Sequence, residues 1–264
     1  MPSISSTEDR IVTARGRLFV KRWMPPGAAG RAPVVLFHDS LGTVELWRDF
    51  PGQLALATAR EIIAYDRAGF GQSDPRPGAL GMNFIRDEAS GSFSDLCEQL
   101  ALERFVAFGH SVGGAMAVAC AAAFPGRCQA LVTESAQAFV EDRTLDGIRD
   151  ARQAFAPPGQ LERLEKYHGG KAAWVLAAWI DTWLSEDFRN WSLDEDLCGL
   201  RCPILAIHGD RDEYGSLRHL ERIAALAGGP VVTKTLPDCG HVPYRERQRA
   251  VTHAVKAFLA QQGL

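Results

Sequence analysis

Short apolar runs alternate with longer mixed segments along the first half of the chain. Residues 34–37, 62–65 and 105–108 are runs without a charged side chain, which is typical of strands buried on both faces. The apolar stretch at 115–124 is long enough for a helix that packs against a sheet, and 130–133 is again strand-like. This alternation predicts a mostly parallel α/β sheet with helices on both faces.

Strand-like and helix-like apolar patterns also occur near both ends of the chain. Residues 11–14 and 18–23 flank a turn that contains glycine, and they predict an initial hairpin. Near the other end, 204–207 and 231–236 are strand-like, and apolar residues recur at helical spacing within 247–259. Together, these runs predict a central sheet of about eight strands.

The segment 135–200 does not follow this alternation. Its pattern is helical, with breaks at 157–159 and 169–170, and the strand pattern restarts only after Cys202-Pro203. We therefore expect an all-helical insertion within the α/β sheet domain.

A G-x-S-x-G motif lies at the junction between the strand-like run that ends at 108 and the apolar helical stretch. It reads Gly109-His110-Ser111-Val112-Gly113. A serine between two glycines at such a junction sits on a tight, strained turn that exposes its hydroxyl. The glycines are needed because a Cβ atom would collide with the neighbouring strand or helix. The motif predicts Ser111 as a nucleophile.

A serine hydroxyl needs a base that takes its proton, and the base needs an acid that orients it. His241 follows one predicted strand, and both Asp210 and Asp212 follow another. These loops leave the carboxyl ends of strands, so they share one edge of the sheet with Ser111. Serine, then aspartate, then histidine is the chain order of one known triad type. From position alone, either aspartate could be the acid of the triad.

The motifs taken together resemble those of the α/β-hydrolase family over nearly the whole chain. The acid loop resembles the family's G-x-x-D, which selects Asp212 over Asp210, and 240–246 is similar to its G-H-x-P-x-x-E. Residues 65–74 resemble the family's D-x-R-G-x-G-x-S-D turn. The resemblance implies a serine hydrolase with Ser111, Asp212 and His241 as catalytic triad, without metal or organic cofactor.

The resemblance also implies an oxyanion hole made by the backbone amides of Ser40 and Val112. Here the chain departs from the family, because His38-Asp39 stands where His-Gly is usual. Two readings of Asp39 stay open: its side chain binds neighbouring backbone, or it contacts polar groups of the substrate. We place His38, Asp39 and His110 among the candidate substrate-binding residues.

In the family, a helical insertion at this point forms a cap over the active site. The resemblance therefore implies a discontinuous core, 1–134 and 201–264, with a cap at 135–200 and a pocket between them. Four of the six tryptophans lie in the cap. Trp179 and Trp183 form one stripe of an apolar helix, and we predict that they line an apolar pocket.

These features favour hydrolysis of a carboxylic ester with an apolar group. Lactone opening, amide cleavage, hydrolysis of a C–C bond and perhydrolysis use the same triad, so fold and triad do not choose among them. A non-catalytic ligand-binding member of the family is the alternative from another class. Its usual signature is a lost triad residue, and this chain retains all three.

Composition agrees with a small-molecule enzyme. The chain has 264 residues with 46% hydrophobic and 23% charged positions, and its net charge of −3 favours neither nucleic acid nor anionic membrane as partner. Residues 1–10 lack the apolar core of a signal peptide, and no apolar run approaches the ~18 residues of a membrane span. We therefore predict a cytoplasmic location. The six cysteines show no zinc-type spacing, and the oligomeric state stays open.

Overall fold

The computed structural model describes residues 4–264, and they contain one sheet of eight strands. The order across the sheet is β1-β2-β4-β3-β5-β6-β7-β8. β1 and β2 pair antiparallel, as do β2 and β4, and all other pairings are parallel. This confirms the predicted sheet. The strands are β1 (Ser5–Thr13), β2 (Gly16–Met24), β3 (Val34–Phe37), β4 (Ile62–Tyr65), β5 (Phe105–His110), β6 (Cys128–Glu134), β7 (Ile204–Gly209) and β8 (Val231–Leu236).

The first strand is longer than its apolar pattern predicts. β1 begins at Ser5 rather than at 11, and it pairs with β2 from Ser5 opposite Met24 to Thr13 opposite Gly16. Most of its side chains are exposed, so the strand carries no alternating apolar signal. Charged side chains on such an edge strand oppose pairing with another sheet. Backbone pairing, not hydrophobic patterning, therefore extends this strand.

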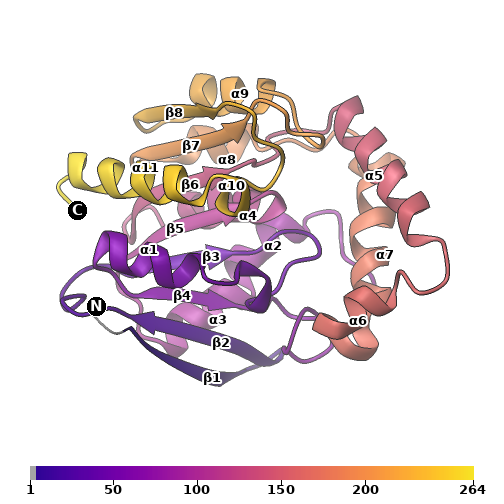
Figure 1. Ribbon diagram of the computed structural model, residues 1–264, viewed down its shortest axis with the longest axis horizontal. Helices are drawn as coiled ribbons and strands as arrows, with labels where there is room; N and C mark the ends of the chain where they lie inside the picture. Colours follow the sequence, from indigo (N-terminus) through magenta and orange to yellow (C-terminus); the bar gives the residue numbers. More distant parts are fainter. Residues whose placement is uncertain (1–3) are drawn as a thin grey trace.

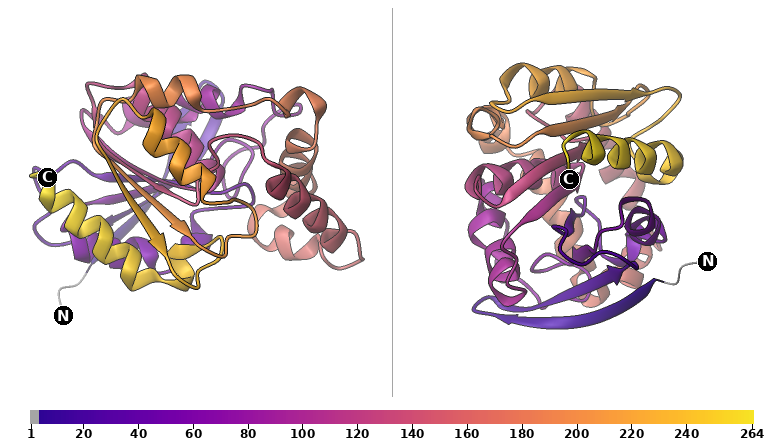
Figure 2. Two further views of the ribbon diagram at one scale, coloured as in Figure 1. Left: turned by 90° about the horizontal axis from the view of Figure 1, so that it is seen from above. Right: turned by 90° about the vertical axis from the view of Figure 1, so that its left-hand side faces the viewer.

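Helices cover both faces of the sheet (Figures 1 and 2). Val35 and Phe37 of β3 enter one apolar cluster, and Val34 and Leu36 enter the other, because successive side chains of a strand point to opposite faces. The first cluster includes α2 (Phe84–Ser90), α3 (Ser92–Gln99), α4 (Val112–Ala123), α8 (Asp194–Gly199) and α9 (Arg218–Leu226). The second includes η1 (Glu45–Trp47), α1 (Phe50–Thr58), α10 (Pro243–Glu246) and α11 (Gln248–Gln261).

The chain between β6 and β7 is helical, as its pattern indicates. Figure 1 shows α5, α6 and α7 to one side of the sheet, beyond the ends of its strands. α8 instead packs against the core helices α4 and α9, and its Leu197 joins the apolar cluster on that face of the sheet. The division into core 1–134 and 201–264 and cap 135–200 stays a prediction. The elements of the insertion are α5 (Asp142–Phe155), α6 (Glu162–His168), η2 (Gly169–Lys171), α7 (Ala172–Trp183), η3 (Glu186–Phe188) and α8.

Candidate active site

Ser111 occupies a strained turn between β5 and α4. Its backbone has φ 57° and ψ −129°, a conformation that costs a non-glycine residue about 1–3 kcal/mol. Gly109 and Gly113 make the turn possible. A Cβ at Gly109 would collide with the carbonyl of Gly113, and one at Gly113 would collide with the carbonyl of Phe37. The turn thus projects the serine side chain at the carboxyl end of β5.

Three side chains from separate loops form a continuous hydrogen-bonded chain. Oγ of Ser111 lies 3.0 Å from Nε2 of His241, and Nδ1 of His241 lies 2.8 Å from Oδ2 of Asp212. All three residues are buried. The imidazole therefore faces the serine with one nitrogen and the carboxylate with the other, which is the arrangement a general base requires.

The structure brings Asp212, and not Asp210, to the histidine. Asp210 is exposed, and its Oδ1 accepts a hydrogen bond from the amide of Cys239. Oδ1 of Asp212 also accepts hydrogen bonds from the amides of Tyr214 and Gly215, at 2.8 and 3.0 Å. The structure therefore distinguishes the two aspartates, although their positions in the sequence are nearly equivalent.

The environment of Asp212 keeps its carboxyl group ionised. Burial raises the pKa of Asp212, but the nearby imidazoles of His241 and His208 outweigh burial and place the pKa well below its ordinary range. Nε2 of His208 lies 3.2 Å from Oδ2 of Asp212. Sequence reasoning missed this contact, although His208 is the penultimate residue of β7, the strand that leads into the acid loop.

The loop 237–242, called here the histidine loop, is held from both sides of His241. Glu246 accepts hydrogen bonds from the amides of Gly240 and Val242, at 2.7 and 3.1 Å. The ring of Tyr214 lies 4.9 Å from the imidazole of His241, measured between centroids. These contacts fix the orientation of the base.

The loop 38–41, called here the oxyanion loop, lies directly against the serine turn, because Gly113 abuts the carbonyls of Phe37 and His38. The structure shows the first reading of Asp39, in which its side chain binds neighbouring backbone, and contact with a substrate stays a prediction. Its Oδ1 accepts a hydrogen bond from the amide of Leu41 at 2.9 Å, and the residue also lines the pocket beside Ser40.

His38 does not line this pocket, contrary to its placement among the substrate-binding candidates. Its Nε2 accepts hydrogen bonds from the backbone amide and from Nε of Arg67, at 3.2 and 3.3 Å. The ring is buried beneath the loop and packs against Phe70, at 5.2 Å between centroids. Its role in the structure is therefore to support the loop from below.

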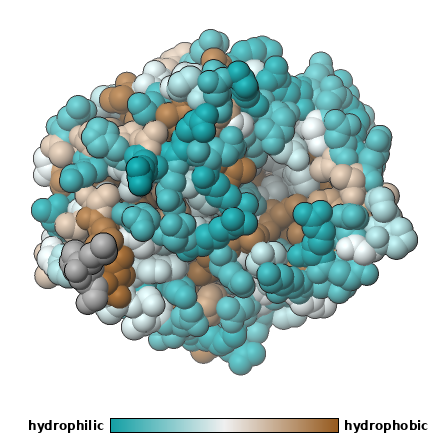
Figure 3. Space-filling view, in the orientation of Figure 1, coloured by the Kyte–Doolittle hydropathy of each residue, from teal (hydrophilic) through white to brown (hydrophobic). Residues whose placement is uncertain are grey.

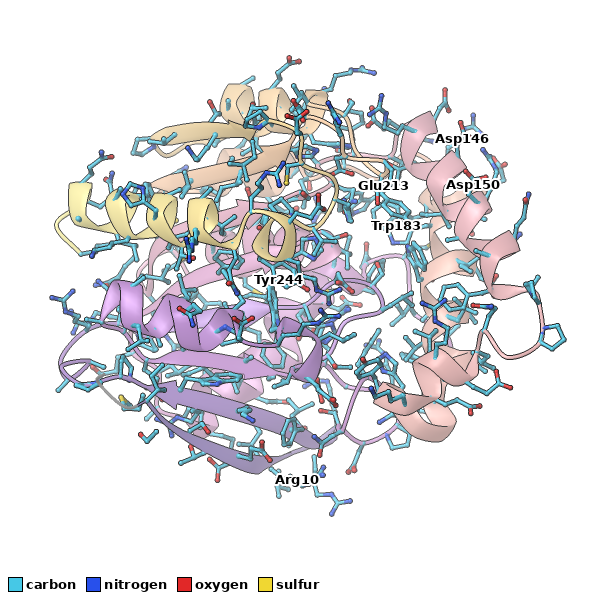
Figure 4. The ribbon with its side chains drawn as sticks, in the orientation of Figure 1. Arg10, Asp146, Asp150, Trp183, Glu213 and Tyr244 are labelled. Atoms are coloured by element: carbon cyan, nitrogen blue, oxygen red, sulfur yellow. The ribbon has the colours of Figure 1, made fainter. Side chains whose placement is uncertain are left out.

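A pocket of about 170 Å³ opens above Ser111, between the sheet loops and helices α5 and α7. Apolar side chains appear in the hollow at this boundary (Figure 3), and Trp183 lies between α7 and the core (Figure 4). The predicted residues that line it are Asp39, Ser40, His110, Ser111, Trp179, Trp183 and His241; those that sequence reasoning missed are Leu41, Gln137, Thr144, Ile148, Tyr214 and Val242. Val112 lines a smaller adjacent cavity together with Ser40.

Two buried polar residues beside the triad were not singled out from the sequence. Oε1 of Gln137 lies 3.4 Å from Oγ of Ser111. Glu134, at the end of β6, has no hydrogen-bond partner for either carboxyl oxygen, and burial raises its pKa to about 8. Glu134 ends the strand beside β5 and Gln137 follows it, and this position at the carboxyl end of a strand was the signal available in the sequence.

A strained serine turn at the end of β5, joined to a buried histidine and aspartate above a parallel sheet, defines an α/β-hydrolase site. The model of the alpha/beta hydrolase family matches residues 34–254. The protein therefore belongs to the alpha/beta hydrolase family, and it is an enzyme, a hydrolase.

Similar proteins include enzymes that act on different bonds. The 2-hydroxy-6-oxo-2,4-heptadienoate hydrolase of Pseudomonas putida is 26% identical, over 99% of this chain and 100% of that protein. The human serine hydrolase BPHL is 28% identical over 69% of this chain and 64% of its own length. A thermophilic esterase from Thermogutta terrifontis matches with a TM-score of 0.73 at 21% identity, over 97% of this chain and 99% of that one, which shows a shared fold.

The membrane and localisation predictions stand apart from the site. Within residues 4–264, none of the helices combines the length and the apolar character that crossing a bilayer requires. The cytoplasmic location stays a prediction.

Proposed function

We propose that this hydrolase cleaves carboxylic esters of small molecules through Ser111, His241 and Asp212. The observation that carries the proposal is the hydrogen-bonded chain of 3.0 and 2.8 Å that ends at a serine on a strained turn. This geometry supplies a nucleophile, a base and an orienting carboxylate without further reorganisation.

In the first half of the reaction, Oγ of Ser111 attacks the acyl carbon while its proton passes to Nε2 of His241. The carbonyl electron pair moves onto oxygen, and we assign the amides of Ser40 and Val112 as the donors that receive this oxyanion. When the carbonyl re-forms, the bond to the leaving oxygen breaks, and that oxygen takes the proton from His241. An alcohol departs, and the acyl group remains on Ser111.

In the second half, water replaces the alcohol. Water gives a proton to His241 and attacks the acyl carbon, and the second oxyanion collapses to release the acid. Oγ of Ser111 then regains the proton from His241. Asp212 stays ionised throughout and stabilises the imidazolium, as its lowered pKa supports. No step in this sequence draws on a metal or cofactor.

The pocket favours an apolar acyl or alcohol group. Trp179, Trp183 and Ile148 form its helical wall, and Leu41 and Val242 contribute apolar surface from the loops. The pocket opens directly over Ser111, and this apolar lining suits a small ester rather than a bulky charged one. We propose that residues 135–200 act as a cap that provides this wall.

Hydrolysis of a C–C bond is the second candidate, because the full-length relative from Pseudomonas putida is named for a dienoate substrate. The residues that line the main pocket include the Asp39 carboxylate but neither lysine nor arginine. A carboxylate-bearing substrate would therefore meet the like charge of Asp39, and the His110 ring in the same pocket already faces that carboxylate at 3.4 Å. We place the ester first for this reason.

The test uses Ser111→Ala with p-nitrophenyl acetate and butyrate and with a fluorophosphonate probe. We expect ester turnover and covalent labelling to disappear, because both require Oγ of Ser111. Labelling at full strength in the variant would show that another residue is the nucleophile. A parallel panel of lactones and a dienoate diketone ranks the acyl substrates by kcat/KM, and faster turnover of the diketone than of any ester would overturn the ester assignment.

A further inference from the structure

His110 contacts two of the loops that surround the nucleophile. Its Nε2 lies 2.8 Å from the carbonyl oxygen of His241, in the histidine loop. Its Nδ1 lies 3.4 Å from Oδ2 of Asp39, in the oxyanion loop. Because His110 directly precedes Ser111, its ring connects the serine turn to both loops at once. The proposed mechanism assigns no role to this ring.

The two contacts determine where the protons of His110 lie. A carbonyl oxygen only accepts hydrogen bonds, so the facing Nε2 carries a proton. Nδ1 has no hydrogen-bond partner among the described residues, but the Asp39 carboxylate at 3.4 Å makes an ion-pair contact that favours a proton on Nδ1 as well. Two protonated nitrogens make the ring an imidazolium opposite the Asp39 carboxylate. The ring is 1% exposed and packs against Trp47 and Tyr244, with centroids 6.4 and 5.1 Å away, so packing holds it in this orientation.

Asp39 uses its two carboxylate oxygens for different purposes. Oδ1 closes a turn by accepting the amide of Leu41, and Oδ2 faces His110. The carbonyl of Asp39 also accepts a hydrogen bond of 2.7 Å from Nη2 of Arg67. Ser40 lies inside the turn that the carboxylate closes. A glycine, the usual residue here in the family, has no side chain for either contact.

We propose that Asp39 and His110 are a pair of positioning residues that hold the oxyanion loop in register with the serine turn and the histidine loop. The inference rests on the proposed function, since it assigns to the pair the placement of the Ser40 amide relative to Ser111. With glycine at position 39, the backbone of this loop would be conformationally freer. In this chain, the charged contact between Asp39 and His110 restrains the loop. Its contribution therefore appears in the transition state, where the oxyanion forms, and much less in substrate binding.

The pair makes activity depend on the protonation of His110. The titratable groups that face the ring are Asp39, Glu134, His241 and Tyr244. Burial lowers the pKa of His110, but the contact with Asp39 and the charge of that carboxylate outweigh burial, so the pKa lies above its ordinary value. As pH rises through this pKa, Nδ1 loses its proton and two acceptors face each other. We therefore expect kcat to fall on the alkaline side.

The experiment compares Asp39→Ala and Asp39→Asn with Asp146→Asn, an exposed carboxylate on α5 (Figure 4). The readouts are kcat and KM for p-nitrophenyl butyrate from pH 5 to 10, and Ki for an alkyl trifluoromethyl ketone. This ketone forms a tetrahedral adduct with serine, and its oxyanion occupies the oxyanion hole. Melting temperatures of all variants identify any loss of folding.

For Asp39→Ala we expect kcat to fall about 10- to 100-fold and Ki of the ketone to rise by a similar factor, with KM within about threefold. The amide introduced by Asp39→Asn donates to a neutral ring nitrogen, so this variant keeps more activity and loses the alkaline decline. Asp146→Asn retains all wild-type values. Glu134→Gln keeps the alkaline decline, which separates the titration of Glu134 from that of His110.

Two outcomes overturn the inference. One is wild-type kcat and ketone Ki in Asp39→Ala, and the other is an unchanged alkaline decline in Asp39→Asn. If Asp39→Ala does not fold, the pH profile of Asp39→Asn decides by itself. Either failure leaves the proposed function intact as long as Ser111→Ala abolishes labelling, so the two proposals fail separately.

Discussion

The two walls of the pocket are built in different ways. The wall that comes from the sheet consists of short loops whose backbone and side chains are held by hydrogen bonds, as at Asp212 and Glu246. The wall that comes from the helices contributes Thr144, Ile148, Trp179 and Trp183, and it is formed mainly by apolar packing. Under the proposed function, the reacting groups stand on the hydrogen-bonded wall, and we expect the apolar wall to select the substrate and to vary with few consequences for the chemistry.

The largest effect is expected from a substitution of Asp212, the acid in the hydrogen-bonded wall. Asp212→Asn should lower kcat by about 10³- to 10⁴-fold, because the amide no longer stabilises the imidazolium and favours the wrong tautomer of His241. Asp210→Asn is the matched control on the same loop and should stay within about threefold of wild type. Steady-state turnover of p-nitrophenyl butyrate measures both, and a larger loss for Asp210→Asn would exchange the roles of the two aspartates.

A smaller effect is expected at the helical wall. Trp179 is half-buried, and its ring lies 6.0 Å from that of Tyr214 across the pocket. Trp179→Ala should lower kcat/KM for p-nitrophenyl butyrate about tenfold and leave that for the acetate nearly unchanged, because only the longer acyl chain reaches the lost surface.

Trp174→Ala is the control on the same helix, since Trp174 packs against Gly69 and Phe70 outside the pocket. An equal loss on acetate and butyrate in Trp179→Ala would show that Trp179 acts on the triad rather than on the substrate. The comparison between the two walls would then no longer hold.

The smallest expected effect concerns stability rather than rate. Burial raises the pKa of Glu134 to about 8, so the folded protein holds a proton on this carboxyl that the unfolded chain releases near pH 4.3. Between about pH 4.3 and 8 the unfolded state therefore binds fewer protons, and the contribution of Glu134 to stability decreases as pH rises. Glu134→Gln should remove this contribution.

Melting temperatures at pH 5 and pH 8 test this expectation. The decrease from pH 5 to pH 8 should be smaller in Glu134→Gln than in wild type, by a few degrees for a chain of this size. Glu165→Gln, at an exposed position on α6, should match wild type. Equal decreases in all three proteins would show that Glu134 is ionised within the fold.

Much of the architecture was predictable because it depends on local pattern. The runs at 34–37 and 105–108 are apolar at every position, since both faces of these strands are covered by helices, and the sheet of about eight strands followed from such runs. β1 was predicted too short, because an exposed edge strand needs no apolar alternation to pair with its neighbour.

In the candidate site too, some features were recognisable from local sequence pattern and others were not. Ser111 was recognisable because a strained turn requires glycine on both sides, and that requirement appears in the sequence itself. The burial of His38 under its loop and the contact of His208 with Asp212 were not recognisable. They depend on which loops meet at the sheet edge. The sequence does not show whether a histidine side chain faces the pocket or the core.

By itself, the sequence determined the class of this protein, since glycine spacing, strand runs and the order of serine, aspartate and histidine are local features. Only the tertiary structure decided how the pocket is closed. It placed Asp39 opposite His110, buried His38 beneath its loop, and left both carboxyl oxygens of Glu134 buried without a hydrogen-bond partner. These contacts join residues far apart in the chain, and their energies depend on burial and distance, which no spacing along a sequence specifies.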